Sequence, residues 1–179
     1  MTKKLFAAAT GMLALFAAAP AFAQGSVDTV IGATFQVLDG CSINGGNNDA
    51  LINFGVLQNA VAQTANIDAS TADGGSTPIT ISCNVNSTVA AFEIQGGQTD
   101  IGSTHNLRGS TSVLIPYRLY ANPQRTIEYT IGNPVVVGTG NITSGVPFNI
   151  IVYGRILAAD ARVAIKDTYT DSVNASLTF

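Results

Sequence analysis

The sequence Asp171-Ser-Val-Asn-Ala-Ser-Leu-Thr-Phe179 alternates apolar and polar residues up to the last position of the chain. Its apolar members are Val173, Ala175, Leu177 and Phe179. Alternation with a period of two predicts a β-strand that buries one of its two faces. Chain ends are usually loose and polar, so an apolar strand at this position is expected to have a partner surface.

A similar row lies shortly before the first cysteine. It consists of Val27, Thr29, Ile31, Ala33 and Phe35, with Val30 as an apolar residue outside the row. This row also predicts a half-buried strand. The pattern leaves two possibilities open. Either the two rows complete a sheet within one molecule, or one row is inserted into the sheet of another molecule.

Residues 1–23 have the three parts of an export signal. A basic start at Lys3-Lys4 precedes an apolar stretch at 5–18, and Ala21-Phe-Ala23 is a small-residue cleavage site. We expect cleavage at this site, so that the exported chain begins at Gln24. No other stretch approaches the length of a membrane-spanning helix, and direct membrane insertion is not expected.

The charge of the chain is low and scattered. Eight Lys and Arg residues against eleven Asp and Glu residues give a net charge of −3, and only 11% of the residues are charged. A protein that binds nucleic acid or anionic lipid is expected to carry a basic cluster. Because the basic residues are dispersed along this sequence, we expect no nucleic-acid partner. A chain of this length is expected to fold as one domain with a sizeable core.

The two cysteines are Cys41 and Cys83. An even number of cysteines in an exported chain predicts disulfide bonding. The bond would close a loop of about forty residues, which a chain-entropy estimate values at about 4 kcal/mol. Metal ligation is a poorer interpretation, because two cysteines and one distant histidine lack the spacing of a zinc site.

The rest of the chain consists of short alternating runs separated by Gly, Asn, Pro and Ser. The clearest runs are 79–85, 89–95, 113–120 and 147–156. Such runs predict an all-β fold, an antiparallel sandwich or barrel. Pro116 cannot donate to a sheet ladder, so the third run is expected at a sheet edge or at a bulge. Only residues 157–165 have a helix-forming composition.

Residues with catalytic or metal-binding potential are few. His105 is the only histidine, and it lies in the polar segment Gly102-Ser-Thr-His-Asn106 without a nucleophile motif to pair with it. We interpret it as a solvated loop residue. The Asn- and Asp-rich segment 44–49 lacks the ligand spacing of a calcium loop, which favours turn chemistry. The sequence therefore predicts no catalytic residue, no metal site and no cofactor, and a protein that is not an enzyme.

Four segments of the chain form a set. They are Val152-Tyr-Gly-Arg-Ile156, Asp167-Thr-Tyr-Thr-Asp-Ser-Val173 with the strand that follows, Leu114-Ile-Pro-Tyr-Arg-Leu-Tyr120 with Arg125-Thr126 after it, and Asn53-Phe-Gly55. Together they resemble the spore coat protein U-like domains, the subunits of archaic chaperone–usher pili. The positions of the two cysteines are similar to those of the family's disulfide. The resemblance covers nearly all of residues 24–179.

The resemblance implies an incomplete immunoglobulin-like β-sandwich that lacks its last strand. It also implies that a periplasmic pilus chaperone first lends a strand, which the amino-terminal extension of the next subunit replaces at the outer-membrane usher. On this interpretation residues 24–36 are the donor extension and residues 37–179 are the pilin domain. The donor side chains are Val27, Thr29, Ile31, Ala33 and Phe35. The acceptor groove and chaperone-contact edge is formed by Val173, Ala175, Leu177 and Phe179.

The expected function is that of a structural pilus subunit that polymerises by donor-strand complementation. It would travel through the periplasm to the surface of a Gram-negative bacterium, where its fibres serve adhesion and biofilm formation. The expected partners are the chaperone, the usher, and other copies of the chain or related subunits. Two alternatives remain. One is a spore-coat-like surface-layer subunit assembled by the same chemistry, and the other is a secreted, self-complemented β-sandwich that acts as a binding module.

Overall fold

The structure is a computed structural model that describes residues 34–36, 38, 40–44, 50–86, 91–136 and 142–179. The chain divides into two units, residues 1–36 and residues 37–179. In the first unit the described residues are Thr34, Phe35 and Gln36, and all three are exposed. The predicted export signal, the predicted donor residues Val27, Thr29, Ile31 and Ala33, and most of the segment 44–49 lie outside the described residues.

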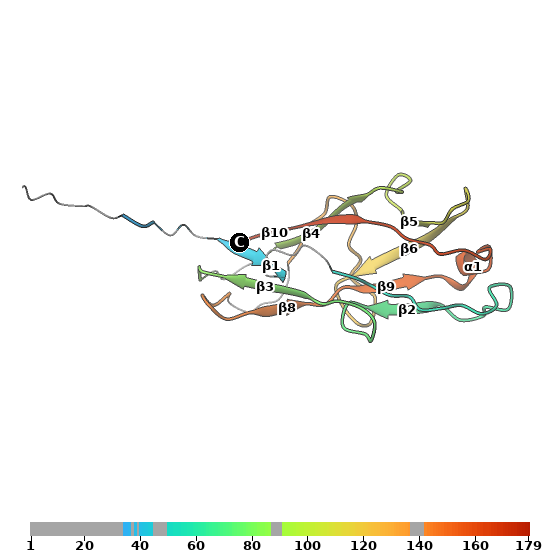
Figure 1. The fold of residues 1–179 in the computed structure, drawn as a ribbon, viewed down its shortest axis with the longest axis horizontal. Coiled ribbons are helices and arrows are strands. Elements are labelled where there is room, and N and C mark those ends of the chain that lie inside the picture. The colour runs from blue at the N-terminus through green and yellow to red at the C-terminus, as the bar shows by residue number, and fades with distance from the viewer. Residues whose placement is uncertain (1–33, 37, 39, 45–49, 87–90, 137–141) are drawn as a thin grey trace, which may run out of the picture. The chain divides into compact units, whose positions relative to one another are not determined.

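The second unit contains ten strands and one short helix among its described residues (Figure 1). The strands are β1 Cys41–Ile43, β2 Ile67–Ser70, β3 Ile79–Cys83, β4 Ala91–Gly97, β5 His105–Arg108, β6 Leu114–Tyr120, β7 Val135–Val136, β8 Phe148–Ile150, β9 Tyr153–Ile156 and β10 Val173–Thr178. The helix α1 spans Ala158–Ala161, within the one segment of helix-forming composition. In the described ranges, no helix has the length and apolarity needed to cross a membrane. The predicted all-β fold is confirmed.

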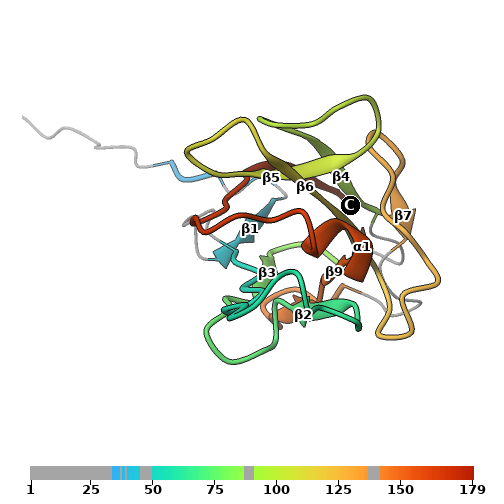
Figure 2. The same cartoon turned by 90° about the vertical axis from the view of Figure 1, so that its right-hand side faces the viewer.

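The strands form three antiparallel sheets, with the strand orders β1-β3-β8, β10-β4-β7 and β2-β9-β6-β5. Figure 1 shows β4, β5 and β10 on one side of the unit and β2, β3, β8 and β9 on the other, and Figure 2 shows β4 and β5 opposite β2, β3 and β9. The ladder between β6 and β9 joins the two sides. The core therefore lies between two layers, as in a sandwich.

The core is made of the alternating rows that the sequence predicted to be buried. Its members include Ile79, Ile81 and Cys83 from β3, Phe92 and Ile94 from β4, and Ile115, Tyr117 and Leu119 from β6. Each of these side chains is buried. Since successive side chains of a strand point to opposite faces, the rows meet between the layers while their polar neighbours face outward.

The predicted run 147–156 is two strands in two different sheets. β8 pairs with β3, whereas β9 pairs with β2 and β6. At the crossing, the Thr71 N–H donates to the Val152 carbonyl at 3.0 Å, and the Val152 N–H donates to Thr71 Oγ1 at 3.1 Å. These bonds satisfy the backbone where the chain leaves one ladder for the other. The inward row continues through the crossing, which is why alternation alone does not reveal it.

The strand that contains Pro116, β6, lies between β9 and β5, so the expectation of a sheet edge was wrong for the strand as a whole. Pro116 pairs with Asn106 of β5, while the pairing of β6 with β9 covers only residues 118–120. Around Pro116 the described part of β6 thus has a ladder on one side only. The amide donor that proline lacks therefore removes no bond to β9.

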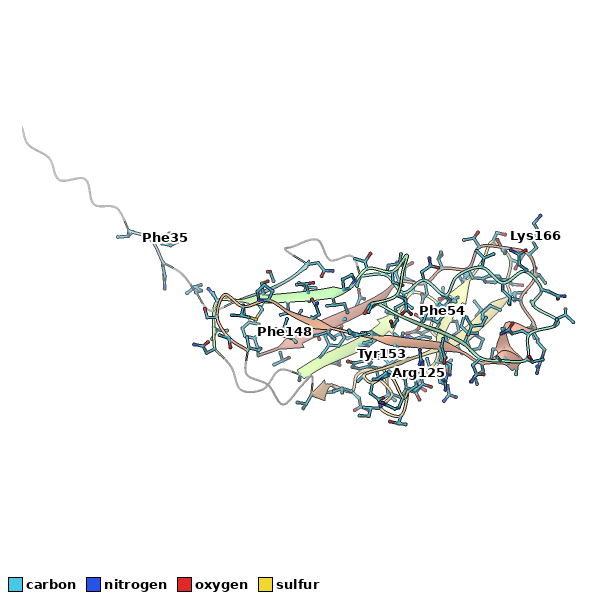
Figure 3. The ribbon with its side chains drawn as sticks, turned by 90° about the horizontal axis from the view of Figure 1, so that it is seen from below. Phe35, Phe54, Arg125, Phe148, Tyr153 and Lys166 are labelled. Atoms are coloured by element: carbon cyan, nitrogen blue, oxygen red, sulfur yellow. A yellow bond between two sulfur atoms is a disulfide. The ribbon has the colours of Figure 1, made fainter. Side chains whose placement is uncertain are left out.

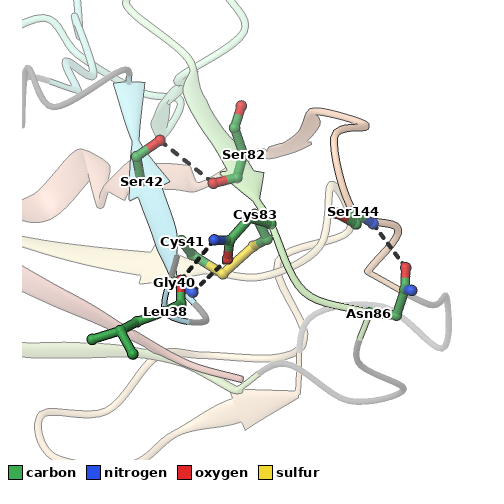
Figure 4. Close-up of a disulfide and its surroundings, with 9 residues drawn as sticks. Leu38, Gly40, Cys41, Ser42, Ser82, Cys83, Asn86 and Ser144 are labelled. Atoms are coloured by element: carbon green, nitrogen blue, oxygen red, sulfur yellow. Dashed lines mark hydrogen bonds between the residues drawn. A yellow bond between two sulfur atoms is a disulfide. The ribbon is translucent and has the colours of Figure 1, made fainter. Parts of the chain in front are cut away.

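The predicted disulfide is confirmed, and it joins β1 to β3 (Figure 4). Cys41 and Cys83 are partners in the ladder between these strands. The side chain of Asn84, directly after β3, also binds the residues directly before β1. It accepts a hydrogen bond from the Gly40 N–H at 2.6 Å and donates one to the Leu38 carbonyl at 2.7 Å. The start of β1 is therefore fixed to β3 by one covalent bond and two polar contacts.

Candidate functional site

The strands β1 and β10 each stand at the end of their sheet's strand order. In the part of the chain that the structure describes, β1 pairs only with β3 and β10 pairs only with β4. A cleft of about 520 Å³ lies beside these two strands. The residues that line it include Ile43 of β1, Val173 and Ala175 of β10, the segment residues Leu51, Ile52 and Phe54, and the core residues Ile79, Ile94, Tyr117 and Val152. Because an open sheet edge carries unpaired N–H and C=O groups, this cleft has both backbone and apolar side chains to offer to another strand.

The four residues predicted for an acceptor groove differ in their surroundings. Val173 and Ala175 line the cleft. Leu177 is half-buried and packs against the core. Phe179 follows the end of β10 and is 45% exposed. The cleft therefore opens along the first half of β10, at its Val173 end.

The side to which each N–H and C=O group of β10 points follows from a hydrogen bond just before the strand. The Gln98 N–H donates a hydrogen bond of 3.2 Å to the Ser172 carbonyl, so the polar groups of Ser172 face the β4 side. Consecutive residues of an antiparallel strand turn their backbone groups to opposite sides. Val173 and Ala175 therefore present their N–H and C=O groups to the open edge.

The ladder between β10 and β4 contains a register shift. Val173 pairs with Gly97, and Ala175 pairs with Ile94, so β4 contributes one more residue than β10 between these pairs. Such a β-bulge bends the strand and increases its twist. Gly97 suits the close packing at the bulge, because a Cβ atom there would lie 2.8 Å from Val173 Cγ1.

A polar cluster lies at the end of the cleft that precedes β10. Asp171 lines the cleft; it accepts a hydrogen bond of 2.9 Å from the Tyr117 hydroxyl and one of 2.8 Å from Thr99 Oγ1. Burial, together with the charge of Asp171, raises the pKa of Tyr117 far above its usual value. The hydroxyl is therefore a permanent donor at physiological pH, and it holds the carboxylate against the aromatic ring.

His105 is buried, with 3% of its surface exposed, and its interpretation as a solvated loop residue was wrong. It begins β5 opposite Tyr117, and the two ring centroids are 5.5 Å apart. Its Nδ1 atom lies 2.9 Å from Asp100 Oδ1. The polar segment before it folds into a tight turn closed by a bridge between Ile101 and Thr104, and this turn brings His105 into the sheet.

Asp100, His105 and Asp171 offer one possible metal ligand each, and these three atoms lie within 4.8 Å of one another. Hydrogen bonds already engage both carboxylates, since Asp100 accepts from His105 and from the Gly97 N–H, and Asp171 accepts from two hydroxyls. Buried polar groups need such partners. We therefore interpret the cluster as a hydrogen-bonded part of the core.

Arg125 anchors the loop after β6 to the neighbouring strands. Its guanidinium donates to the carbonyl of Gly154 at 3.2 Å and to that of Ala69 at 3.3 Å, and it lies 5.7 Å from the centroid of the Tyr153 ring. Figure 3 shows Arg125 beside Tyr153. The backbone of Arg125 has a positive φ of 56°, which non-glycine residues rarely adopt. These contacts hold β9 in place behind Phe54, whose ring would meet a Cβ atom at Gly154.

Sequence reasoning missed one part of the cleft wall. Leu51, Ile52 and Phe54 line this part, and they lie in a segment without regular alternation. The available signal was the density of large apolar residues in Leu51-Ile-Asn-Phe54, directly after a polar stretch. Phe54 packs edge-on against Tyr117, with ring centroids 6.0 Å apart, so the segment is anchored to the core although it is not a strand.

Comparison with known proteins identifies the family of this chain. The sequence profile of the Spore Coat Protein U domain (SCPU) matches residues 28–176. The chain belongs to the SCPU family. The match includes residues 28–36 of the first unit together with nearly all of the second. Most of the amino-terminal row is thus part of the SCPU domain itself.

No curated protein sequence matches this chain. A similar solved structure is the pre-assembly complex of the chaperone CsuC with the tip adhesion subunit CsuE, from the archaic chaperone–usher Csu pili of Acinetobacter baumannii. The sequence identity is 20% and the TM-score is 0.48. The match covers 80% of this SCPU chain and 40% of the other chain.

Proposed function

We propose that this SCPU protein is a structural subunit of a surface pilus and that its cleft accepts a strand from another subunit. The observation that carries the proposal is the pair of open edges, β1 and β10, beside an apolar cleft of about 520 Å³. On this proposal the fold is an immunoglobulin-like sandwich that lacks one strand. An inserted strand bonds to the edge backbone and buries one row of side chains, the recognition mode called strand addition.

The proposed donor is the amino-terminal extension, residues 24–36, and the proposed pilin domain is residues 37–179. The donor side chains are Val27, Thr29, Ile31, Ala33 and Phe35. Burial of four apolar side chains of this row, at about 1.5 kcal/mol each, contributes at least ~6 kcal/mol before ordering costs. Backbone bonds along the open edge add to this contribution.

The open edge of β10 also explains why such a subunit would need a chaperone before assembly. An exposed apolar edge strand pairs readily with other chains and leads to aggregation. We propose that a periplasmic chaperone covers the cleft and the residues Val173, Ala175, Leu177 and Phe179 until an outer-membrane usher exchanges it for the donor of the next subunit. Export to the surface of a Gram-negative bacterium, adhesion and biofilm formation complete this structural, non-catalytic role.

The first experiment removes the donor and supplies it again as a peptide. A variant that lacks residues 24–35 keeps the cleft, and a synthetic peptide of residues 24–36 should fill it. Because a ligand that binds only the folded state stabilises that state, the peptide should raise the melting temperature of the variant. A matched peptide with Ile31→Asp should not, since it would bury a charge in an apolar cleft. Equal shifts with both peptides would contradict the proposal.

The second experiment asks whether the donor acts between molecules. The full chain, expressed with its chaperone and usher, should give a ladder on unheated SDS gels that collapses on boiling. The variant without residues 24–35 should give none. A full chain that stays monomeric, with a melting temperature that depends on residues 24–35, would instead show a self-complemented sandwich.

A further inference from the structure

We infer that the donor row lies on β10 in one register, with Ala33 opposite Val173 and Ile31 opposite Ala175. This inference rests on the proposed function and specifies its contact. The register also sets Phe35 beside Asp171. It follows from the direction of β10, the face that lines the cleft, and the sizes of the facing side chains.

The donor strand is expected to run antiparallel to β10. Every strand pair among the described residues is antiparallel, and Figure 1 shows the carboxyl end of the chain, after β10, beside the start of β1. A donor antiparallel to β10 leaves the cleft at the opposite end of that strand, toward Asp171. The amino-terminal segments of successive subunits then point in the same direction, and the contact can repeat without limit.

The apolar row of the donor has to face the cleft, so the possible registers differ from one another by two residues. Val173 and Leu177 pack against the core, and alternation places Ala175 on the same face, so the partners of Val173 and Ala175 must come from the apolar row of the donor. A slip by one residue would turn that row to the outside. The remaining choice is between registers that differ by two residues.

The sizes of the side chains distinguish these registers. In the inferred register the small Ala33 faces the larger Val173, and the large Ile31 faces the small Ala175. A slip of two residues would set Ile31 against Leu177, which already packs into the core, and Ala33 against Ala175. That arrangement crowds one position and leaves a void at the next, and both defects destabilise a packed interface. A slip of two residues in the other direction would set the large Ile31 against the large Val173 and would crowd that position instead.

The polar cluster agrees with the inferred register at the Phe35 position. Hydrogen bonds to Tyr117 and Thr99 hold the Asp171 carboxylate in place. The ring of Phe54, edge-on to Tyr117 at 6.0 Å, lines the same cleft. A further ring from Phe35 would join these two in the offset contacts that aromatic side chains favour.

The outer face of the ladder provides the test. In the inferred register Gly32 lies opposite Asn174 and Val30 lies opposite Ser176. Because the backbone of Ser172 faces β4, alternation makes Asn174 and Ser176 face β4 as well. Their pairs with the donor are then of the non-hydrogen-bonded type, in which opposite side chains are closest. Opposite Cβ atoms are about 5 Å apart and diagonal ones are farther, whereas a disulfide needs about 4 Å.

The experiment introduces cysteine pairs into the full chain, expressed with its chaperone and usher, and examines boiled, non-reduced gels. Gly32→Cys with Asn174→Cys should give a covalent ladder. Gly32→Cys with Ser176→Cys, the pair for the two-residue slip, should give at least tenfold less. A second set, Val30→Cys with Ser176→Cys against Val30→Cys with Thr178→Cys, repeats the comparison where the first variants fold poorly. Each single cysteine variant controls for exchange with the native disulfide.

The outcomes separate the register from the proposed function. A covalent ladder from the slipped pairs would overturn the register and leave strand donation intact. A heat-sensitive ladder without any cross-link would overturn the inferred register. A cross-link within monomers would keep the register but refute donation between subunits. The absence of any ladder from the unmodified chain would refute the proposed function and the register with it.

Discussion

The hydroxyl of Tyr117 donates a hydrogen bond of 2.9 Å to the carboxylate of Asp171. Tyr117 belongs to the inner strand β6, and Asp171 precedes the edge strand β10. The bond therefore connects the interior of one sheet to the segment that begins the open edge of another. It also marks where the cleft changes from apolar to polar.

Loss of this bond should destabilise the fold. We expect Tyr117→Phe to lower the free energy of unfolding by about 2 kcal/mol, the size typical of a hydrogen bond to a charged group. Tyr129→Phe is the matched control, because the buried Tyr129 hydroxyl has no partner in the described structure. Its removal should leave stability unchanged or improve it. Urea unfolding of both variants checks the prediction, and equal losses would contradict it.

Stability should fall in alkaline solution. Burial raises the pKa of Tyr129 to about 12, and the pKa of Tyr117 is raised as well. In the unfolded chain both ionise near pH 10, so above that pH the folded state binds more protons than the unfolded state. The free energy of unfolding should then fall by about 1.4 kcal/mol per pH unit for each tyrosine.

The variant Tyr129→Phe tests this pH dependence directly. It should lose stability about half as steeply as the unmodified chain between about pH 10 and 12. Thermal melts across this range measure the slope. An unchanged slope would mean that Tyr129 ionises in the folded state as easily as in the unfolded one.

Arg125 should not be replaceable by lysine. Its planar group donates to two carbonyls of neighbouring strands while it faces the ring of Tyr153, and an ammonium group cannot reproduce that geometry. We expect Arg125→Lys to cost about 2 kcal/mol. Arg118→Lys is the control, because within the described part of the chain the one polar contact of the Arg118 side chain is an exposed ion pair of 3.6 Å with Glu128, which is worth little. Chemical unfolding of the two variants should show the difference.

A methyl group at Gly154 should disturb the cleft wall. A Cβ atom there would lie 2.6 Å from Phe54 Cζ, and the ring cannot move without giving up its contact with Tyr117. We expect Gly154→Ala to destabilise the fold by about 1–3 kcal/mol and to weaken binding of the peptide of residues 24–36. Gly74→Ala is the control, since a Cβ atom there meets nothing within 4 Å. Melting curves with and without peptide check both effects.

Alternation predicted most of the core correctly because a half-buried strand requires it. The rows around Ile81, Phe92 and Tyr117 are buried as expected. Alternation failed where two physical situations share one pattern. The row through Val152 continues inward while the backbone changes sheets, and local sequence does not encode which ladder accepts the bonds.

The candidate site was partly predictable for a similar reason. The β10 row has its own periodicity, so Val173 and Ala175 could be identified. The wall at Phe54 is held by tertiary packing rather than by a repeating pattern. His105 is buried because a tight turn brings it into the sheet and Asp100 binds its ring. The polar segment around His105 indicated neither the turn nor the partner. Irregular segments follow contacts made far along the chain, and a single sequence shows these only indirectly.

The disulfide at the start of β1 has a mechanical consequence. Residues ahead of Cys41 are the ones through which a proposed fibre would pull on each subunit. Tension that arrives there meets a covalent bond to Cys83 in β3, so β1 cannot peel away from the sheet one hydrogen bond at a time. The load passes instead through this covalent bond to β3, so β1 and β3 have to leave the rest of the subunit together.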